Sequence, residues 1–122
     1  MPFPCAVELC DVSKLYGSFA ALRKLSAEFH SAQCYVILGQ NGAGKSTLLR
    51  VIAGLIRPTY GSQTILGSSD PSVIRSRVGY LGHDSMLYDE LTAVENLRYF
   101  ASLYPGSHTS IMAPVEALET VG

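Results

Sequence analysis

Apolar positions along the first half of the chain follow three patterns, and each predicts a different kind of element. In residues 5–16 and 22–29 apolar residues recur often or alternate in part with polar ones, which predicts two strands on either side of the turn signal Gly17-Ser18. Residues 34–38 form an uninterrupted apolar run, which predicts a strand buried on both faces of a parallel sheet. Residues 45–55 predict a helix, because four apolar residues recur there at helical spacing: Leu48, Leu49, Ile52 and Leu55.

The second half of the chain alternates between short extended and helical patterns. Short strands are predicted at residues 63–66 and 78–81, with a turn or a single helical turn at residues 70–77 between them. Antiparallel strands at the front, followed by a buried strand and a helix, place the chain in the α/β class.

Two helices are predicted near the end of the chain. Thr92 and Glu95 have the spacing of a capping box, in which a hydroxyl and a carboxylate satisfy free backbone amides reciprocally. The helix that begins there is predicted to end at Pro105-Gly106, and its apolar stripe comprises Val94, Leu97, Phe100, Ala101 and Tyr104. A last helix is predicted over residues 111–121, where Ile111, Val115, Leu118 and Val121 have helical spacing.

The loop between the apolar run and the first helix carries the chemistry. Residues 39–47 fit G-x-x-x-x-G-K-[ST] directly after a predicted strand and at the start of a predicted helix. Small residues are needed because the backbone must curl closely around a phosphate, so a Cβ at Gly42 or Gly44 is expected to obstruct it. The predicted phosphate-binding residues are Gly39, Gln40, Asn41, Gly42, Ala43, Gly44, Lys45, Ser46 and Thr47.

Three side chains of this loop have predicted roles toward a nucleoside triphosphate. Lys45 is expected to reach the β and γ phosphates and so to act in catalysis as well as in binding. The Ser46 hydroxyl is expected to bind Mg²⁺, and Thr47 is expected to lie near the α phosphate. The alternative is a glycine-rich turn with an exposed lysine, but the strand before the loop and the helix after it favour nucleotide binding.

Charge and composition exclude several classes of protein. The net charge of −1 argues against a nucleic-acid partner. No apolar run approaches the roughly 18 residues of a membrane-spanning helix, so we expect any membrane contact to be peripheral. Three cysteines without a Cys-x-x-Cys pair suggest neither a disulfide framework nor a zinc site.

Four segments of the chain together resemble the ATP-binding subunits of ABC transporters: residues 12–17, 39–47, 78–81 and 91–97. The resemblance implies a P-loop NTPase fold with an antiparallel β portion, in which residues 1–90 form the ATPase core and residues 91–122 begin a helical subdomain. It also implies ATP and Mg²⁺ as ligands, a membrane-spanning transporter subunit and a second ATPase subunit as partners, and a peripheral place on the cytoplasmic face of the cell membrane.

Two further site residues come from this resemblance. An aromatic residue at the place of Tyr16 stacks on the adenine ring in the family, whereas the alternative for Tyr16 is an ordinary tyrosine at the end of a strand. His83 stands where the family usually has a glutamine that senses the metal and the γ phosphate, and the alternative is a histidine on a surface loop. The sequence around His83 is most similar to the haem-exporter ATPases of cytochrome c maturation, and the alternative is another ABC exporter with a substituted glutamine.

The sequence lacks three motifs that the family carries after the glycine loop. It contains no LSGGQ-like signature, no apolar strand ending in Asp-Glu and no switch histidine in the expected context. The chain therefore resembles the amino-terminal half of the ATPase domain and is expected to hydrolyse ATP poorly alone. Two alternatives stay open, a non-catalytic ATP-binding module and a P-loop kinase or GTPase.

Overall fold

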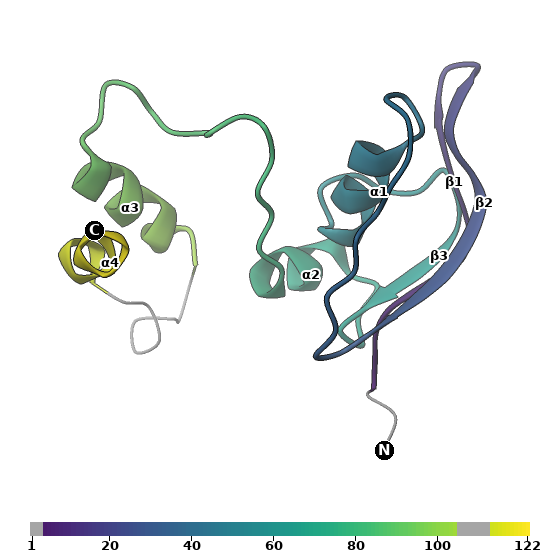
Figure 1. The fold of residues 1–122 in the computed structure, drawn as a ribbon, viewed down its shortest axis with the longest axis horizontal. Coiled ribbons are helices and arrows are strands. Elements are labelled where there is room, and N and C mark those ends of the chain that lie inside the picture. The colour runs from purple at the N-terminus through teal and green to yellow at the C-terminus, as the bar shows by residue number, and fades with distance from the viewer. Residues whose placement is uncertain (1–3, 105–112) are drawn as a thin grey trace. The chain divides into compact units, whose positions relative to one another are not determined.

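The computed structural model describes residues 4–104 and 113–122, which divide into one unit that ends at Tyr80 and a second that begins at Leu81 (Figure 1). The first unit contains β1 (Cys5–Tyr16), β2 (Phe19–His30), α1 (Lys45–Ile52), β3 (Tyr60–Ile65) and α2 (Pro71–Arg77). The second contains α3 (Ala93–Ser102) and α4 (Pro114–Val121). None of the described helices has the length and hydrophobicity needed to span a membrane.

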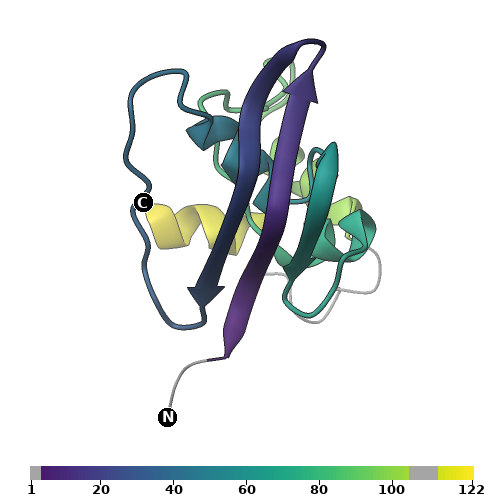
Figure 2. The same ribbon diagram turned by 90° about the vertical axis from the view of Figure 1, so that its right-hand side faces the viewer.

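The three strands form one antiparallel sheet in the order β2-β1-β3 (Figure 2). Strict alternation would send Leu9 and Val12 to opposite faces, yet both side chains are buried. The strand pairing is irregular between these two residues, and Asp11 there has a φ of 48°. This irregularity shifts the alternation of side chains by one position, so that both Leu9 and Val12 face the core. The Asp11 amide donates a hydrogen bond of 2.9 Å to the Ser26 hydroxyl, which anchors this irregularity to β2.

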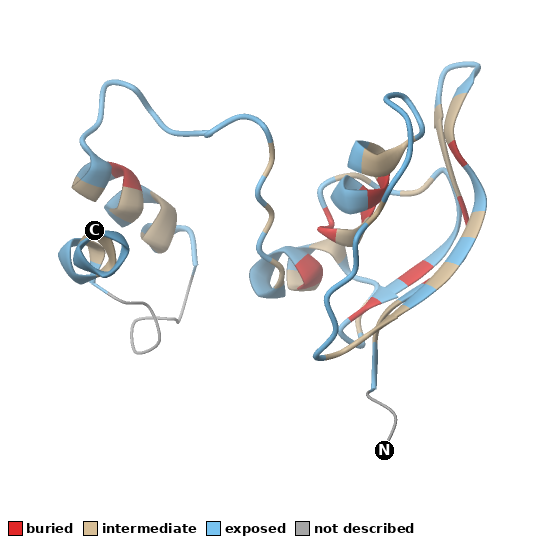
Figure 3. Cartoon of the chain, in the orientation of Figure 1, coloured by how far each residue is buried: buried red, intermediate tan, exposed pale blue. Residues whose placement is uncertain are grey.

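The core of the first unit lies where α1 and α2 cover one face of the sheet (Figure 3). Every element of the unit contributes to it, since its buried members are Leu9, Val12, Leu22, Leu48, Val51, Ile65 and Ile74. Burial of such side chains stabilises a fold by about 1.5–3 kcal/mol each. This packing fixes the start of α1 against β2, and so positions the glycine loop that precedes the helix.

The prediction of strands at residues 34–38 and 78–81 is wrong, because neither segment is a strand in the structure. Val36 and Leu38 are 77% and 86% exposed, and Leu81 is 95% exposed. A strand of a parallel sheet exists only when neighbouring strands accept and donate its backbone hydrogen bonds. Within the described residues only the three antiparallel strands form, so these apolar runs have no strand to pair with.

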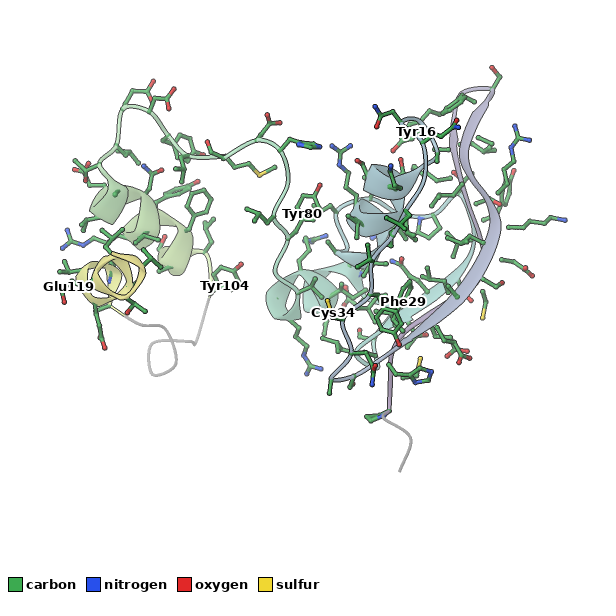
Figure 4. The ribbon with its side chains drawn as sticks, viewed as in Figure 1. Tyr16, Phe29, Cys34, Tyr80, Tyr104 and Glu119 are labelled. Carbon is green, nitrogen blue, oxygen red and sulfur yellow. The ribbon has the colours of Figure 1, made fainter. Side chains whose placement is uncertain are left out.

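The segment at residues 34–38 is nevertheless anchored to β2 through Tyr35. The Tyr35 hydroxyl accepts a hydrogen bond of 2.9 Å from the His30 amide. Its ring meets Phe29 edge to face with a centroid separation of 4.8 Å. Figure 4 labels Phe29 on β2 and Cys34 at the start of this segment. Of the run, only Ile37 packs against the core of the described residues.

The predicted helix at residues 45–55 ends three residues early, at Ile52. The amide of Leu55 donates to the carbonyl oxygen of Arg50 at 2.9 Å, and the amide of Gly54 donates to that of Val51 at 3.1 Å. These two bonds form a Schellman motif, which satisfies the last carbonyl groups of the helix and turns the chain away.

The apolar residues in and after α1 differ in burial. Leu48 and Val51 are buried, whereas Leu49 and Leu55 are 44% and 45% exposed. Apolar residues at helical spacing therefore do not all face the core in this helix.

The remaining predicted elements of the first unit form with shifted ends. The predicted strand at residues 22–29 begins three residues earlier, at Phe19, and the predicted strand at residues 63–66 is β3. The turn predicted at residues 70–77 is the short helix α2, which begins at Pro71. Asp70 caps it, because its carboxylate accepts a hydrogen bond of 2.9 Å from the Ser72 amide.

The capping box predicted at the start of α3 is confirmed. The Glu95 amide donates to the Thr92 hydroxyl at 3.2 Å, and the Thr92 amide donates to the Glu95 carboxylate at 2.7 Å. Beside it, the buried Asn96 side chain bonds both the amide and the carbonyl of Tyr88. The loop before α3 is thus tied to the first turn of the helix.

The apolar stripe predicted for α3 is only half-buried, and Tyr104 lies beyond the helix end and is 47% exposed. The last helix begins at Pro114, where proline suits the first helical position. The helix end predicted at Pro105-Gly106 and the predicted position of Ile111 lie outside the described residues. The predicted division between core and helical subdomain near residue 90 stays a prediction.

The capping box gives α3 a pH dependence with a defined sign. The hydrogen bond from the Thr92 amide, reinforced by the Thr92 side chain, holds the pKa of Glu95 below its ordinary value. A carboxyl whose pKa is lowered on folding stabilises the helix above its unfolded pKa and ceases to do so as the pH falls through the folded value. Amide exchange protection of α3 should therefore decline on acidification in the wild type and stay flatter in Glu95→Gln.

The matched control for this experiment is Glu116→Gln on α4, where the carboxylate is also exposed. It should leave the pH profile of α3 as in the wild type. An unchanged acid response of α3 in Glu95→Gln would show that the capping box does not carry the pH dependence.

Candidate phosphate-binding site

A cavity of about 270 Å³ opens where three parts of the first unit meet. These parts are the tip of the β1-β2 hairpin, the glycine loop and the first turn of α1. The volume is near the lower end of the range for small-molecule sites. The residues that line it are Tyr16, Phe19, Ala21, Asn41, Gly42, Gly44, Lys45, Ser46 and Thr47.

Most of the side chains and loop positions predicted from the sequence meet at this cavity. Three predicted loop residues, Gly39, Gln40 and Ala43, are not among those that line it. Instead, the Ala43 amide donates to the carbonyl oxygen of Gln40 at 3.1 Å and closes a turn inside the loop. The structure also brings Phe19 and Ala21 to the cavity, which the sequence analysis did not predict.

Gly44 is the residue at which the loop packs closely against β2. Its φ of 94° is left-handed, and a Cβ there would lie 2.4 Å from the carbonyl oxygen of Ala21 on β2. Gly42 also has a left-handed φ, of 88°, but a Cβ there would meet no described atom within 4 Å. A Cβ at Gly44 would therefore collide with β2, whereas at Gly42 only the left-handed backbone conformation requires glycine within this structure. The expected obstruction toward a phosphate stays a prediction at both positions.

The start of α1 supplies hydrogen-bond donors to the cavity. By helix geometry, the backbone amides of Lys45, Ser46 and Thr47 have no acceptor inside the helix. Within α1, all of which the structure describes, the first turn carries no acidic side chain. The positive end of the helix dipole is therefore not neutralised locally, and the site favours an anion.

Lys45 adds a full positive charge beside these amides. Its ammonium group donates a hydrogen bond to the carbonyl oxygen of Gly39 at the other end of the loop. The side chain is thus folded along the loop and lines the cavity at the same time. A phosphate entering the cavity would compete with the Gly39 carbonyl for this donor, and a charged acceptor gives the stronger hydrogen bond.

Tyr16 lies at the end of β1, close to the glycine loop (Figure 4). Its side chain is 48% exposed, so a large part of the ring is free to contact a ligand. The Lys14 ammonium lies over the ring at 5.4 Å from its centroid, a cation–π contact. The arrangement therefore leaves one face of the ring for a second partner.

The Ser46 side chain offers an oxygen ligand for Mg²⁺ at this cavity, as predicted from its place in the loop motif. The hydroxyl is exposed at the first turn of α1 and lines the cavity, and Mg²⁺ prefers oxygen ligands. Among the described residues no group of three or more His, Cys, Asp or Glu side chains could hold a metal ion. Ser46 would therefore be the residue of this chain that holds Mg²⁺ if phosphate oxygens supplied further ligands.

His83 belongs to the second unit, where its side chain is exposed. Its predicted contact with the metal and the γ phosphate stays a prediction.

Most of the chain matches one known protein family. Residues 22–121 match the family described as ABC transporter. The chain belongs to the ABC transporter family.

The chain is 43% identical over 107 residues to the Nod factor export ATP-binding protein I of Sinorhizobium fredii, a match that covers 85% of this chain and 31% of that protein. It is 41% identical over 102 residues to the ABC transporter ATP-binding protein NatA of Bacillus subtilis, covering 80% of this chain and 42% of that protein. It thus spans well under half of these relatives' length.

The fold agrees with this family. A dimeric structure of the ATP-binding cassette MJ0796 bound to ADP and Pi matches with a TM-score of 0.75 at 29% identity, covering 93% of this chain and 54% of that chain. The predicted fold class is therefore confirmed as a P-loop ATPase fold of the ABC type with an antiparallel β portion.

Adding a methyl group at Gly42 and at Gly44 should destabilise the protein by different amounts. Gly42→Ala should lower the free energy of unfolding by about 1 kcal/mol, because only the left-handed conformation opposes it. Gly44→Ala should lower it by about 3 kcal/mol, because contact with the Ala21 carbonyl adds to the same strain. Denaturant unfolding followed by circular dichroism measures both, and equal losses would contradict the described packing.

Proposed function

We propose that this chain is the ATP-binding part of an ABC transporter ATPase. The observation that carries the proposal is the cavity in which the loop of the G-x-x-x-x-G-K-[ST] motif, the start of α1 and Tyr16 meet. Loop amides and Lys45 offer donors for phosphates, and Tyr16 offers an aromatic surface at the same cavity. The two curated relatives described above are both named ATP-binding proteins, which supports ATP as the nucleotide.

In this proposal the loop holds the phosphates through its backbone. Amides of the loop and of the first turn of α1 donate to the phosphate oxygens, and Lys45 exchanges the Gly39 carbonyl for the β and γ phosphates. Thr47 lies near the α phosphate, and Tyr16 stacks on the adenine ring. Mg²⁺, held by Ser46 with phosphate oxygens, neutralises charge on the phosphates when it is bound.

Hydrolysis and transport belong to the proposal for the whole protein. We expect a second ATPase subunit and a membrane-spanning subunit as partners, at the cytoplasmic face of a cell membrane. MJ0796 was observed as a dimer bound to ADP and Pi, which supports pairing of ATPase subunits. The name of the Sinorhizobium fredii relative refers to export, which supports an exporter.

Haem as the transported molecule stays a prediction from the sequence around His83. The relatives described above have other names, so nothing in them supports haem. The role of His83 as a substitute for the family's glutamine likewise stays a prediction, which the chemistry of its side chain supports because imidazole nitrogens can form hydrogen bonds.

The direct test is the affinity for ATP with Mg²⁺, measured by isothermal titration calorimetry on the wild type and on Lys45→Ala. Losing a charged hydrogen-bond donor to phosphate should weaken binding about 10- to 100-fold. The matched control is Arg50→Ala, which removes an exposed cation from the last turn of the same helix and should leave the affinity nearly unchanged.

Three results would speak against the proposal in different ways. Equal ATP affinity in the wild type and Lys45→Ala would show that the loop does not hold the phosphates. GTP outcompeting ATP would favour the GTPase alternative. In a parallel turnover assay, binding without any hydrolysis by the whole protein together with its membrane subunit would favour a non-catalytic module.

A further inference from the structure

We propose that Phe19 is a second aromatic contact for the base of the nucleotide, across the hairpin from Tyr16. The inference rests on the proposed ATP-binding function and extends it to a residue outside the loop motif. The starting observation is that Phe19 lines the same cavity as Tyr16 and the residues of the glycine loop.

The register of the hairpin places the two rings together. Tyr16 and Phe19 are direct partners across the antiparallel β1-β2 ladder, joined by the two-residue turn Gly17-Ser18. Residues directly opposite one another project to the same face, with Cβ atoms about 4.5–5.5 Å apart. Ala21, two residues along β2, lies opposite an irregularity in the pairing between Lys14 and Leu15 and also lines the cavity.

Exposure separates Phe19 from the structural residues of β2. Leu22 is 7% exposed and belongs to the core, whereas Phe19 is 60% exposed. The core of the described residues, with the partly buried side chains packed against it, does not include Phe19. Packing in the core therefore does not account for an aromatic ring at this position. A flat apolar ligand in the cavity would cover the exposed part of the ring.

Lys14 limits how much of the Tyr16 ring is available to a base. Its ammonium lies over one face of the Tyr16 ring, so a base can stack only on the other face. Phe19 supplies further aromatic surface at the same cavity. Every base has a π face, so we expect Phe19 to strengthen binding of nucleoside triphosphates without selecting ATP over GTP.

The test compares three ligands by calorimetry in the whole protein: ATP, GTP and inorganic tripolyphosphate. Phe19→Ala should lower the affinity for ATP and for GTP about tenfold each, since stacking on one aromatic side chain contributes to binding on that scale. It should leave the affinity for tripolyphosphate unchanged. Phe19→Trp, which keeps an aromatic ring, should bind ATP and GTP as tightly as the wild type. The matched control is Tyr60→Ala, which removes another exposed aromatic ring, on β3, that is not among the residues lining the cavity.

The outcomes separate this inference from the proposed function. Unchanged ATP affinity in Phe19→Ala would overturn it, and so would an equal loss for tripolyphosphate, because Phe19 would then support only the loop. A wild type that binds neither ATP nor tripolyphosphate would instead refute the proposed function. Should Phe19→Ala not fold by circular dichroism, Phe19→Leu keeps the apolar volume, removes the aromatic face and should show the same selective loss.

Discussion

The first turn of α1 leaves backbone amides without partners in the helix, and the close approach of Gly44 to the Ala21 carbonyl on β2 holds that turn in place. Unpaired amides are costly inside a protein unless water or a ligand accepts their hydrogen bonds. Here they lie at a cavity together with Lys45, with no acidic group in the same turn. The same packing that orders the loop therefore creates a site for an anion.

The sheet contributes to the site through its geometry as well as its core. The hairpin of β1 and β2 ends beside the glycine loop, so aromatic side chains at its tip share a cavity with the phosphate-binding backbone. A polar subsite made of backbone amides and an apolar subsite made of rings suit the two chemically different ends of a nucleotide.

The sequence alone predicted those features that depend on local chemistry. The loop motif, the capping box at Thr92 and Glu95 and the turn at Gly17-Ser18 all appear in the structure, because each is determined by residues near one another in the chain. The apolar run at residues 34–38 was misinterpreted, because its state depends on hydrogen-bonding neighbours that its own pattern does not specify.

Other features depended on packing that the hydrophobic pattern does not contain. Ordinary alternation does not reveal that Asp11 adopts a left-handed φ and so brings Leu9 and Val12 into one core. Phe19 is part of no motif, and it could have been found only by pairing it with Tyr16 across the predicted turn. The Schellman ending of α1 had a signal in Gly54, which the helical spacing of Leu55 obscured.

Phosphate binding by backbone amides of the loop and of the first turn of α1 is the property on which the proposed function depends. A titration of ¹⁵N-labelled protein with tripolyphosphate, followed by amide chemical shifts, observes those amides one by one. We predict that the largest changes occur at residues 42–47, with small changes at Tyr16 and Phe19. Changes centred elsewhere in the chain, or no saturable change at those amides, would contradict phosphate binding at this loop.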